Sequence, residues 1–373
     1  MAARFDFVMI IGMGLIGGSL AGALRADNPR VRIYALDIND ETAARAVSLG
    51  LADEAPSREE SIRLLGDGDV DLVVLAAPVD AYGAWFDFLD ESGFEGVVTD
   101  TGSTKEPAII LANEHLRKPE RFVPGHPMAG SEQEGLDGAR SDLFQNAYWI
   151  LTPGVKTDIY AFRRLHELLT QLGARVLSID PEEHDRAVAI ISHVPHVAAA
   201  ALVQLAGKHS GENGELLRLA AGGFKDTTRI AAGSAELWTG ILLNNREIVA
   251  DELSEFADII RNIHELVKNG DATEVKRFLQ SASTIRNSLP AKWVKTETGL
   301  IEIRIPMDDR KGIIAEITTA AGHAECNIEA IDIDHQTEDR AILELILTDE
   351  GDLEGFIETL KESGFKPRKR LLD

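Results

Sequence analysis

Hydrophobic residues follow two different spacings along the first half of the chain. Continuous apolar runs at residues 7–11, 31–36 and 72–76 are typical of strands buried on both faces of a parallel sheet. Further strands are predicted at residues 96–99, 122–124, 147–152 and 175–179, and helical spacing lies at residues 15–25, 40–49, 58–65 and 158–172. This alternation predicts an α/β domain of the Rossmann type over residues 1–180, with a largely parallel, doubly wound sheet.

The pattern changes at residue 181, after which helical spacing stands alone. It covers residues 182–207, with a kink expected at Pro195, and then residues 214–221, 235–268 and 273–283. We therefore expect an all-helical domain over residues 181–290. Its long helices carry apolar stripes that need a partner surface, which favours a homodimer.

A third pattern follows a polar linker at residues 288–298. Strand-like spacing at residues 300–305, 328–335, 341–347 and 366–371 is interrupted by helical spacing at residues 311–321 and 353–363. The order βαββαβ predicts a ferredoxin-like unit over residues 298–373.

A glycine-rich turn links the first strand to the first helix. Gly12, Gly14 and Gly17 fit the pattern G-x-G-x-x-G, in which the glycines allow a tight turn, close approach of a pyrophosphate and close helix packing. The second strand ends in Asp37, twenty residues after Gly17, where a carboxylate binds the ribose hydroxyls of NAD and repels the phosphate of NADP. Pro78 follows another strand end on the same side. These features predict NAD as the cofactor.

Composition and charge narrow the function classes. The 373 residues carry a formal net charge of −24, which argues against binding to nucleic acid or to anionic membrane surfaces. Cys326 is the single cysteine, so an internal disulfide and a cysteine-based metal site are excluded. No run of about 18 apolar residues lacks glycine and charge, so we expect no membrane span and a cytoplasmic location.

Two polar residues follow strand ends on the side expected to face the cofactor. His126 is predicted in a loop rich in Gly and Pro, where it would accept a proton near neutral pH. The alternative is a loop histidine without a role. Ser103 is placed to hydrogen-bond a reacting oxygen, but Glu106 three residues later also fits a helix N-cap.

The helical half adds two further groups. His193 and His196 share a helix face, which suits an anion-facing role better than a metal pair, because no third ligand cluster is near in sequence. Lys225 and Arg229 are four residues apart. Arg229 is suited to grip a carboxylate with two parallel hydrogen bonds, and the alternative is an ordinary surface pair.

Four motifs occur in order after the glycine-rich turn: Asp100-x-Gly102-Ser103-x-Lys105, His126-Pro-Met-Ala-Gly-Ser-Glu132, His193-x-Pro-His196 and Gly223-Phe-Lys-Asp-x-Thr-Arg229. Together they resemble the prephenate dehydrogenase family of tyrosine biosynthesis, and the last 75 or so residues resemble an ACT domain. The resemblance implies NAD-dependent oxidative decarboxylation of prephenate to 4-hydroxyphenylpyruvate, with tyrosine as an inhibitor acting through the ACT domain.

The same resemblance implies roles for individual residues. His126 accepts the proton of the ring hydroxyl and Ser103 hydrogen-bonds that hydroxyl, while Arg229 binds the ring carboxylate. The other residues implied to bind substrate are His196, Lys225, Ser131, Glu132, Asp226 and Trp238, the last of which reaches a neighbouring subunit's pocket in this family. The residues implied to bind NAD are Gly12, Met13, Gly14, Leu15, Ile16, Gly17, Asp37 and Pro78, and those implied to regulate are Asp309, Gly312, Asn327 and Ile328.

Three alternatives remain open at this point. Arogenate, with an amino group where prephenate has a ketone, is an alternative substrate of a cyclohexadienyl dehydrogenase. A β-hydroxyacid-type dehydrogenase shares the two-domain plan but uses a Lys on the first long helix of the helical domain, where this chain has His193 and His196. A non-catalytic amino-acid sensor would not need the set of His126, Ser103 and Arg229.

Overall fold

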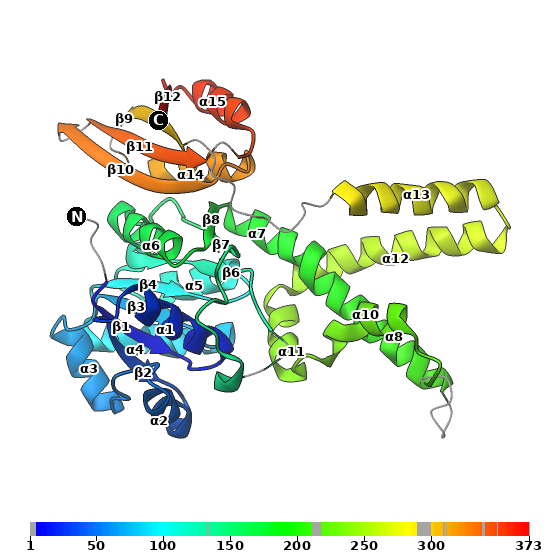
Figure 1. Ribbon diagram of the computed structural model, residues 1–373, viewed down its shortest axis with the longest axis horizontal. Helices are drawn as coiled ribbons and strands as arrows, with labels where there is room; N and C mark the ends of the chain where they lie inside the picture. The colour runs from blue at the N-terminus through cyan, green and yellow to red at the C-terminus, as the bar shows by residue number, and fades with distance from the viewer. Residues whose placement is uncertain are drawn as a thin grey trace. The chain divides into compact units, whose positions relative to one another are not determined.

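The chain forms two compact units (Figure 1). The computed structural model describes residues 5–131, 133, 135–210, 218–288, 300–308, 310, 312–337, 340–348 and 350–372. The first unit combines residues 1–184 with residues 298–373, and the second comprises residues 185–297.

A five-stranded parallel sheet is the centre of the first unit. Its order is β2-β1-β3-β4-β5, and every residue of β3 and β4 is buried, as expected for strands covered on both faces. The strands are β1 Phe7–Ile11, β2 Arg32–Leu36, β3 Leu72–Leu75, β4 Val97–Asp100 and β5 Phe122–Val123. The helices between them are α1 Leu15–Asp27, α2 Asp40–Ser48, α3 Arg58–Gly66, α4 Tyr82–Ser92 and α5 Glu106–His115. The strand order confirms the predicted Rossmann-like topology.

Helix α4 is absent from the sequence-based prediction. Tyr82, Phe86 and Leu89 are buried at helical spacing, and the helix ends at Gly93, whose φ of 73° is favourable only for glycine among common residues. The spacing of these three residues and Gly93 were the signals that could have predicted it.

The predicted single sheet is wrong beyond β5. Strands β6 Gly125–Pro127, β7 Tyr148–Leu151 and β8 Arg175–Ser178 form a separate three-stranded sheet, in which β6 pairs antiparallel with β7. Pro124 separates β5 from β6 and has no N–H to continue a ladder, so the chain leaves the first sheet there. His126 therefore lies on a strand rather than in a loop. Helix α6 Ile159–Gln171 connects β7 to β8.

The second unit contains helices only, among the residues that the structure describes. Helix α7 Pro181–Val188 leads through a π-helical turn, Ala189–His193, into α8 Val194–His209. The extra residue in a π turn relaxes the backbone just before Pro195, where the kink was expected. The predicted helix at residues 235–268 is divided at Asn245. The remaining helices are α10 Gly222–Thr228, α11 Ala235–Asn244, α12 Arg246–Lys268 and α13 Ala272–Ser288.

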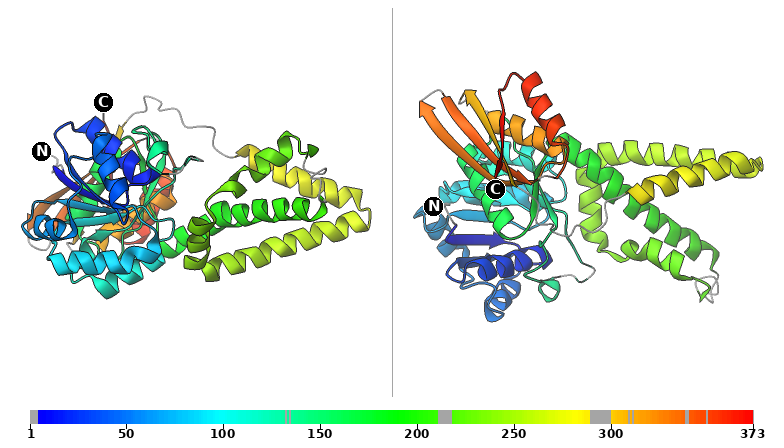
Figure 2. Two further views of the ribbon diagram at one scale, coloured as in Figure 1. Left: turned by 90° about the horizontal axis from the view of Figure 1, so that it is seen from below. Right: turned by 45° about the horizontal axis from the view of Figure 1, so that its top comes forward.

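Helices α12 and α13 lie side by side in all views (Figure 2). Asn245 separates α11 from α12 because its buried side-chain amide donates to the carbonyl of Asp185 (2.7 Å). The predicted helix at residues 214–221 lies largely outside the described residues, and so does most of the linker at residues 288–298.

The helix Pro181–His209 is long and apolar enough to cross a membrane by length and composition. Its most apolar stretch has a mean hydropathy of 1.7, and 33% of it is buried. The helix also contains His193 and His196, which are both buried, and it contacts α12. Buried polar residues in contact with a neighbouring helix are typical of a core helix.

The C-terminal part of the first unit is a four-stranded antiparallel sheet of order β10-β11-β9-β12. Its elements are β9 Leu300–Asp308, α14 Ile313–His323, β10 Ile328–Thr337, β11 Arg340–Thr348, α15 Leu353–Glu362 and β12 Arg368–Leu372. Alternate residues of β9 are buried under α14 and α15, which contact each other. Helix α14 also packs against β8 of the nucleotide-binding part.

Buried His166 makes the fold sensitive to acid. The side chain on α6 is 1% exposed, and burial lowers its pKa from 6.5 to about 4. Above pH 6.5 the ring is neutral in both the folded and the unfolded state, so its burial does not reduce the free energy of unfolding. As the pH falls from 6.5 to 4, only the unfolded state takes up the proton, which lowers the free energy of unfolding by about 3 kcal/mol at ~1.4 kcal/mol per pKa unit.

We expect His166→Leu to reduce this loss of stability between pH 7 and pH 4. Urea unfolding at both pH values measures it, with His209→Leu as the control, because His209 is exposed. An equal loss of stability in wild type and His166→Leu would contradict the assignment.

Candidate active site

The glycine-rich turn is an open cradle at the carboxyl end of β1. Gly12 has a φ of 98°, and a Cβ there would overlap the carbonyl of Ala76. A Cβ at Gly17 would overlap the carbonyl of Gly12. Nothing lies within 4 Å of the corresponding position at Gly14, which is the N-cap of α1 without a side-chain cap. The uncapped helix start and the open space fit a pyrophosphate group.

Asp37 holds this turn in place. Its Oδ2 accepts a hydrogen bond from the N–H of Met13 (2.7 Å), and its Oδ1 accepts one from the N–H of Asn39 (2.9 Å). A carboxylate has about four acceptor positions, so both oxygens retain capacity for ribose hydroxyls. Asp37 therefore fits NAD while also fixing the backbone of the turn. Leu15 and Ile16, in the first turn of α1, are partly buried.

Pro78 and Ser103 lie at the carboxyl ends of the neighbouring strands β3 and β4. Pro78 is exposed directly after β3, and Ser103 is partly buried between β4 and α5. The capping alternative for Ser103 is wrong, because α5 begins at Glu106 and its N-cap is Lys105, without a side-chain cap. The helix starts late because the Lys105 side chain turns inward instead.

Lys105 and Asp100 form a buried ion pair beneath the site, and both side chains are 0% exposed. The ammonium group also donates to the carbonyl oxygen of Gly125 (2.7 Å), and Asp100 Oδ1 accepts the N–H of Gly125 (2.9 Å). Tyr82 donates its hydroxyl to Asp100 Oδ2 (3.0 Å), and burial together with the Asp100 charge raises the pKa of Tyr82 well above its usual value. The pair thus fixes both backbone groups of the residue that precedes His126.

His126 lies on β6 and forms a hydrogen bond to a second histidine. Its Nδ1 is 2.9 Å from Nε2 of His184, and the rings meet edge to face. His184 is 1% exposed on α7, and its backbone N–H donates to Asp180. Nδ1 of His126 is thus engaged by His184, and this contact fixes the orientation of the His126 ring. Sequence analysis missed His184, because its contact with His126 joins residues 58 positions apart in the sequence.

In the second unit, His196 and Trp238 stack on each other. Their ring centroids are 3.6 Å apart and their planes differ by 13°. His196 is 7% exposed, and burial lowers its pKa, which favours the neutral ring. His193 meets Trp238 edge to face at 6.2 Å and lies 3.4 Å from the amide of Asn245. The structure therefore brings the two histidines and Trp238 of one chain together.

The predicted anion-binding residues also belong to the second unit, on the segment that precedes Trp238 in the sequence. Lys225 and Asp226 are on α10, Arg229 starts the following 3-10 turn, and all three are exposed. The hydroxyl groups of Thr227 and Thr228 donate to the carbonyl oxygens four residues earlier in the same helix, so both hydroxyls are satisfied within α10.

The remaining candidates are only partly described. Glu132 and Asp309 lie outside the described residues, and Ser131 is exposed after β6, where its hydroxyl accepts the N–H of Gln133 (3.1 Å). Gly312 caps the start of α14, whereas Asn327 and Ile328 follow its other end. The described regulatory candidates therefore lie at opposite ends of α14.

Two family models match the chain. The one described as "Prephenate dehydrogenase, nucleotide-binding domain" matches residues 20–178, and the one described as "Prephenate dehydrogenase, dimerization domain" matches residues 180–281. A prephenate dehydrogenase of Bacillus subtilis (strain 168) is 38% identical over 338 residues, which are 90% of this chain and 90% of the relative. The chain belongs to the prephenate dehydrogenase family.

Solved structures support the same family. The prephenate dehydrogenase from A. aeolicus, in complex with hydroxyphenyl propionate and NAD+, is 32% identical at a TM-score of 0.72, covering 78% of this chain and 100% of that one. Synechocystis arogenate dehydrogenase is 32% identical at a TM-score of 0.63, covering 76% of this chain and 100% of that one. This member of the family is an NAD-dependent oxidoreductase with a Rossmann-like nucleotide-binding domain and a helical dimerisation domain.

Proposed function

We propose that this member of the prephenate dehydrogenase family uses His126 as the base that initiates oxidative decarboxylation of prephenate. The observation that carries the proposal is the hydrogen bond between Nδ1 of His126 and Nε2 of His184 (2.9 Å). It fixes the orientation of the His126 ring, so that Nε2 faces away from His184 and is the proton acceptor. Measuring the pH dependence of kcat/KM tests this, and a profile without an ionisation between about pH 5 and pH 8 would contradict it.

The residues then act in a defined order. Nε2 of His126 takes the proton of the hydroxyl at C4 of prephenate, and Ser103 donates a hydrogen bond to that oxygen. NAD, when bound, accepts the hydride that leaves C4. Loss of carbon dioxide from C1 makes the ring aromatic, its electron pair returns to the C4 oxygen, and His126 gives back the proton. The products are 4-hydroxyphenylpyruvate, carbon dioxide and reduced cofactor.

Arg229 is proposed to bind the ring carboxylate, because a guanidinium group matches a carboxylate with two parallel hydrogen bonds. In a chain of net charge −24, a doubly charged substrate needs such a local cation. His196 and Lys225 are proposed at the pyruvyl side. Ser131, Glu132, Asp226 and Trp238 are proposed to complete the polar surroundings.

We expect Arg229→Ala to raise the KM for prephenate by about 10- to 100-fold, as expected for losing a charged hydrogen-bond pair of about 1.5–3 kcal/mol. Steady-state kinetics with saturating NAD measure it. The control is Arg261→Ala, since Arg261 is an exposed arginine on α12 that pairs with Asp258 three residues away. An unchanged KM for prephenate would remove Arg229 from the site.

Arogenate is the alternative substrate, because one solved relative is an arogenate dehydrogenase. Comparing kcat/KM for prephenate and arogenate, each with NAD and with NADP, decides between them. We expect prephenate with NAD to give the highest value, since Asp37 would repel the additional phosphate of NADP. A higher value with arogenate would assign the chain to the alternative.

A homodimer is proposed for the helical unit. Large apolar side chains are exposed on its helices, including Leu202, Leu205, Leu243 and Ile260, and exposed apolar surface of this kind marks an interface. We expect static light scattering to give twice the chain mass of 40.6 kDa. A mass of one chain at micromolar concentration would contradict the dimer.

The C-terminal part of the first unit is proposed to be an ACT domain through which tyrosine inhibits the enzyme. The βαββαβ element order of residues 300–372 supports it, and inhibition of the full chain by tyrosine tests it. We also propose a cytoplasmic location, because the proposed reaction is a step of amino-acid biosynthesis.

A further inference from the structure

The buried carboxylate of Asp100 joins three segments of the first unit. The hydroxyl of Tyr82, which follows the turn after β3, donates to Asp100 Oδ2 (3.0 Å). The N–H of Gly102, after β4, donates to the same oxygen (2.9 Å), and the N–H of Gly125, on β6, donates to Oδ1 (2.9 Å). Together with the ammonium group of Lys105, these donors fill the about four acceptor positions of a carboxylate.

The turn after β3 and the turn after β4 also pack directly on each other. A Cβ at Gly102 would lie 2.7 Å from the side chain of Val79 and 2.9 Å from the hydroxyl of Tyr82, so the close approach requires glycine. Pro78 directly precedes Val79, and Ser103 directly follows Gly102. A displacement of one turn therefore displaces the other.

The ring and the hydroxyl of Tyr82 make separate contacts. The side chain is 0% exposed, and its ring meets Phe86 edge to face with the centroids 5.8 Å apart. Phe86 in turn meets Phe122 of β5 at 5.2 Å. The hydroxyl lies closer to Asp100 Oδ2 (3.0 Å) than to the carbonyl oxygen of Leu75 (3.3 Å). Removing the hydroxyl alone thus breaks the contact with Asp100 and leaves the packing of the ring.

We propose that Tyr82 is a positioning residue for the oxidation of prephenate and acts through Asp100. Its hydroxyl fixes the turn after β3, which carries Pro78, relative to Ser103 and His126. Such precision affects the rate, because a displacement of about 1 Å in a reacting group can cost about 10²-fold. The inference rests on the proposed roles of Ser103 and His126, and it adds a residue that the sequence motifs do not include.

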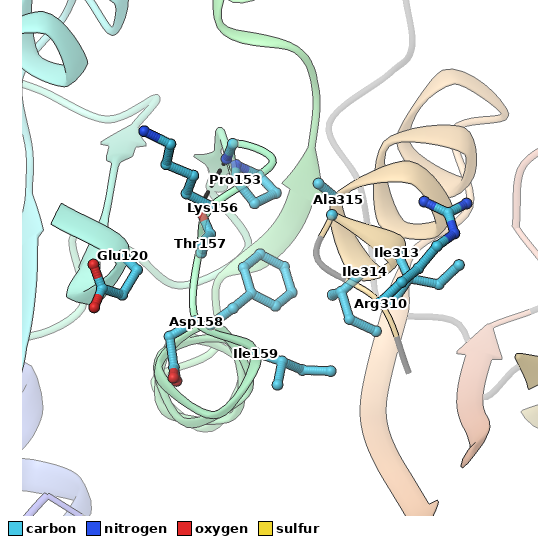
Figure 3. Close-up of a pocket in the computed structure, with 13 residues that line it drawn as sticks. Glu120, Pro153, Lys156, Thr157, Asp158, Ile159, Arg310, Ile313, Ile314 and Ala315 are labelled. Carbon is cyan, nitrogen blue, oxygen red and sulfur yellow. Dashed lines mark hydrogen bonds between the residues drawn. The ribbon is translucent and has the colours of Figure 1, made fainter. Parts of the chain in front are cut away.

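Four variants of the full chain separate positioning from packing. Tyr82→Phe removes the hydroxyl and keeps the ring. Tyr160→Phe is its matched control, because Tyr160 is an exposed tyrosine on α6, next to Ile159 at the cavity shown in Figure 3. Phe86→Leu changes the packing around Tyr82 but leaves its hydroxyl in place. Gly102→Ala disturbs the same contacts from the side of β4.

We expect Tyr82→Phe to lower kcat by about 2- to 10-fold, the rate equivalent of one neutral hydrogen bond. The KM for prephenate and the Kd for NAD remain unchanged, because the predicted anion-binding residues and the glycine-rich turn belong to other segments. Turnover is divided by the number of NAD-binding sites, found by fluorescence titration, so that misfolded chains do not count. Tyr160→Phe and Phe86→Leu retain the wild-type kcat per binding site.

A second readout does not depend on turnover. In a chain labelled with ¹⁵N-histidine, the ring signals of His126 are identified by their absence in His126→Asn, and they report the contact with His184. We expect these signals to shift in Tyr82→Phe and in Gly102→Ala, because Asp100 holds the residue before His126. They stay in place in Tyr160→Phe.

The proposal is overturned if either kcat per binding site or the His126 ring signals are the same in Tyr82→Phe and Tyr160→Phe. It is also overturned if Phe86→Leu lowers kcat per binding site as much as Tyr82→Phe does, because packing would then explain the loss. If Tyr82→Phe does not fold, Gly102→Ala decides by the same two measurements. A wild type that forms no NADH from prephenate contradicts the proposed function instead, and the ring signals then still test the contact of Tyr82.

Discussion

His126→Asn lowers kcat by about 10²- to 10⁴-fold, the range for loss of a general base. The asparagine amide keeps a hydrogen-bonding atom at the position of Nδ1, near His184, but does not accept a proton near neutral pH. The affinity for NAD is expected to be unchanged, because the predicted cofactor residues lie after β1, β2 and β3 and in the first turn of α1. Pre-steady-state and steady-state NADH formation, together with NAD titration by fluorescence, measure both quantities.

His184→Gln is the informative companion to this variant. It removes the ring that holds Nδ1 of His126 while leaving the base in place, so we expect a smaller loss of kcat and a shifted pH profile. Unchanged turnover in His126→Asn would remove His126 from its role. Equal pH profiles in wild type and His184→Gln would show that the contact between the histidines is only structural.

Lys105→Met lowers the free energy of unfolding by about 3–5 kcal/mol, the typical result of removing one partner of a buried ion pair. Asp100 then remains a buried carboxylate with neutral donors only, from Tyr82 and from the backbone of Gly102 and Gly125. The carbonyl of Gly125 also loses its partner. Urea unfolding monitored by tryptophan fluorescence measures the change.

Two controls identify the cause. Lys118→Met removes an exposed lysine that pairs with Glu95, and we expect it to change stability by less than about 1 kcal/mol. The double variant Asp100→Asn with Lys105→Met removes both charges, so it is expected to be more stable than Lys105→Met alone. If the double variant is the less stable of the two, the uncompensated charge on Asp100 is not the cause.

Local patterns explain why so much of the nucleotide-binding half was predictable. The turn of Gly12, Gly14 and Gly17 requires backbone conformations and close contacts that only glycine allows, so the spacing of the glycines predicts the turn directly. Asp37 was predicted because a fixed number of residues separates it from that turn. Its hydrogen bond to Met13 was not predicted, because no spacing rule reports which backbone group a carboxylate reaches.

Contacts between distant segments explain most of what was missed. His184 meets His126 across 58 residues of sequence, and periodicity within a helix carries no information about such a partner. The first sheet ends at Pro124, which has no N–H. The sequence shows this proline, but it does not indicate that the following strands form a second sheet. Lys105 belongs to the motif Asp100-x-Gly102-Ser103-x-Lys105, but the motif alone does not indicate that its side chain is buried against Asp100.

The helical unit shows the same limit. The pattern predicted long helices with apolar stripes, but not the break at Asn245, which results from a side-chain hydrogen bond to Asp185 sixty residues away. It also gave no sign that Trp238 stacks on His196. Both features are tertiary contacts of polar or amphipathic side chains, which hydrophobic spacing does not describe.

NADH absorbance on mixing the purified chain with prephenate and NAD tests the central claim most directly. We predict that NADH, carbon dioxide and 4-hydroxyphenylpyruvate form in equal amounts, and that His126→Asn at the same concentration forms them at least about 100-fold more slowly. No NADH from either prephenate or arogenate, with a chain that binds NAD, would contradict the account.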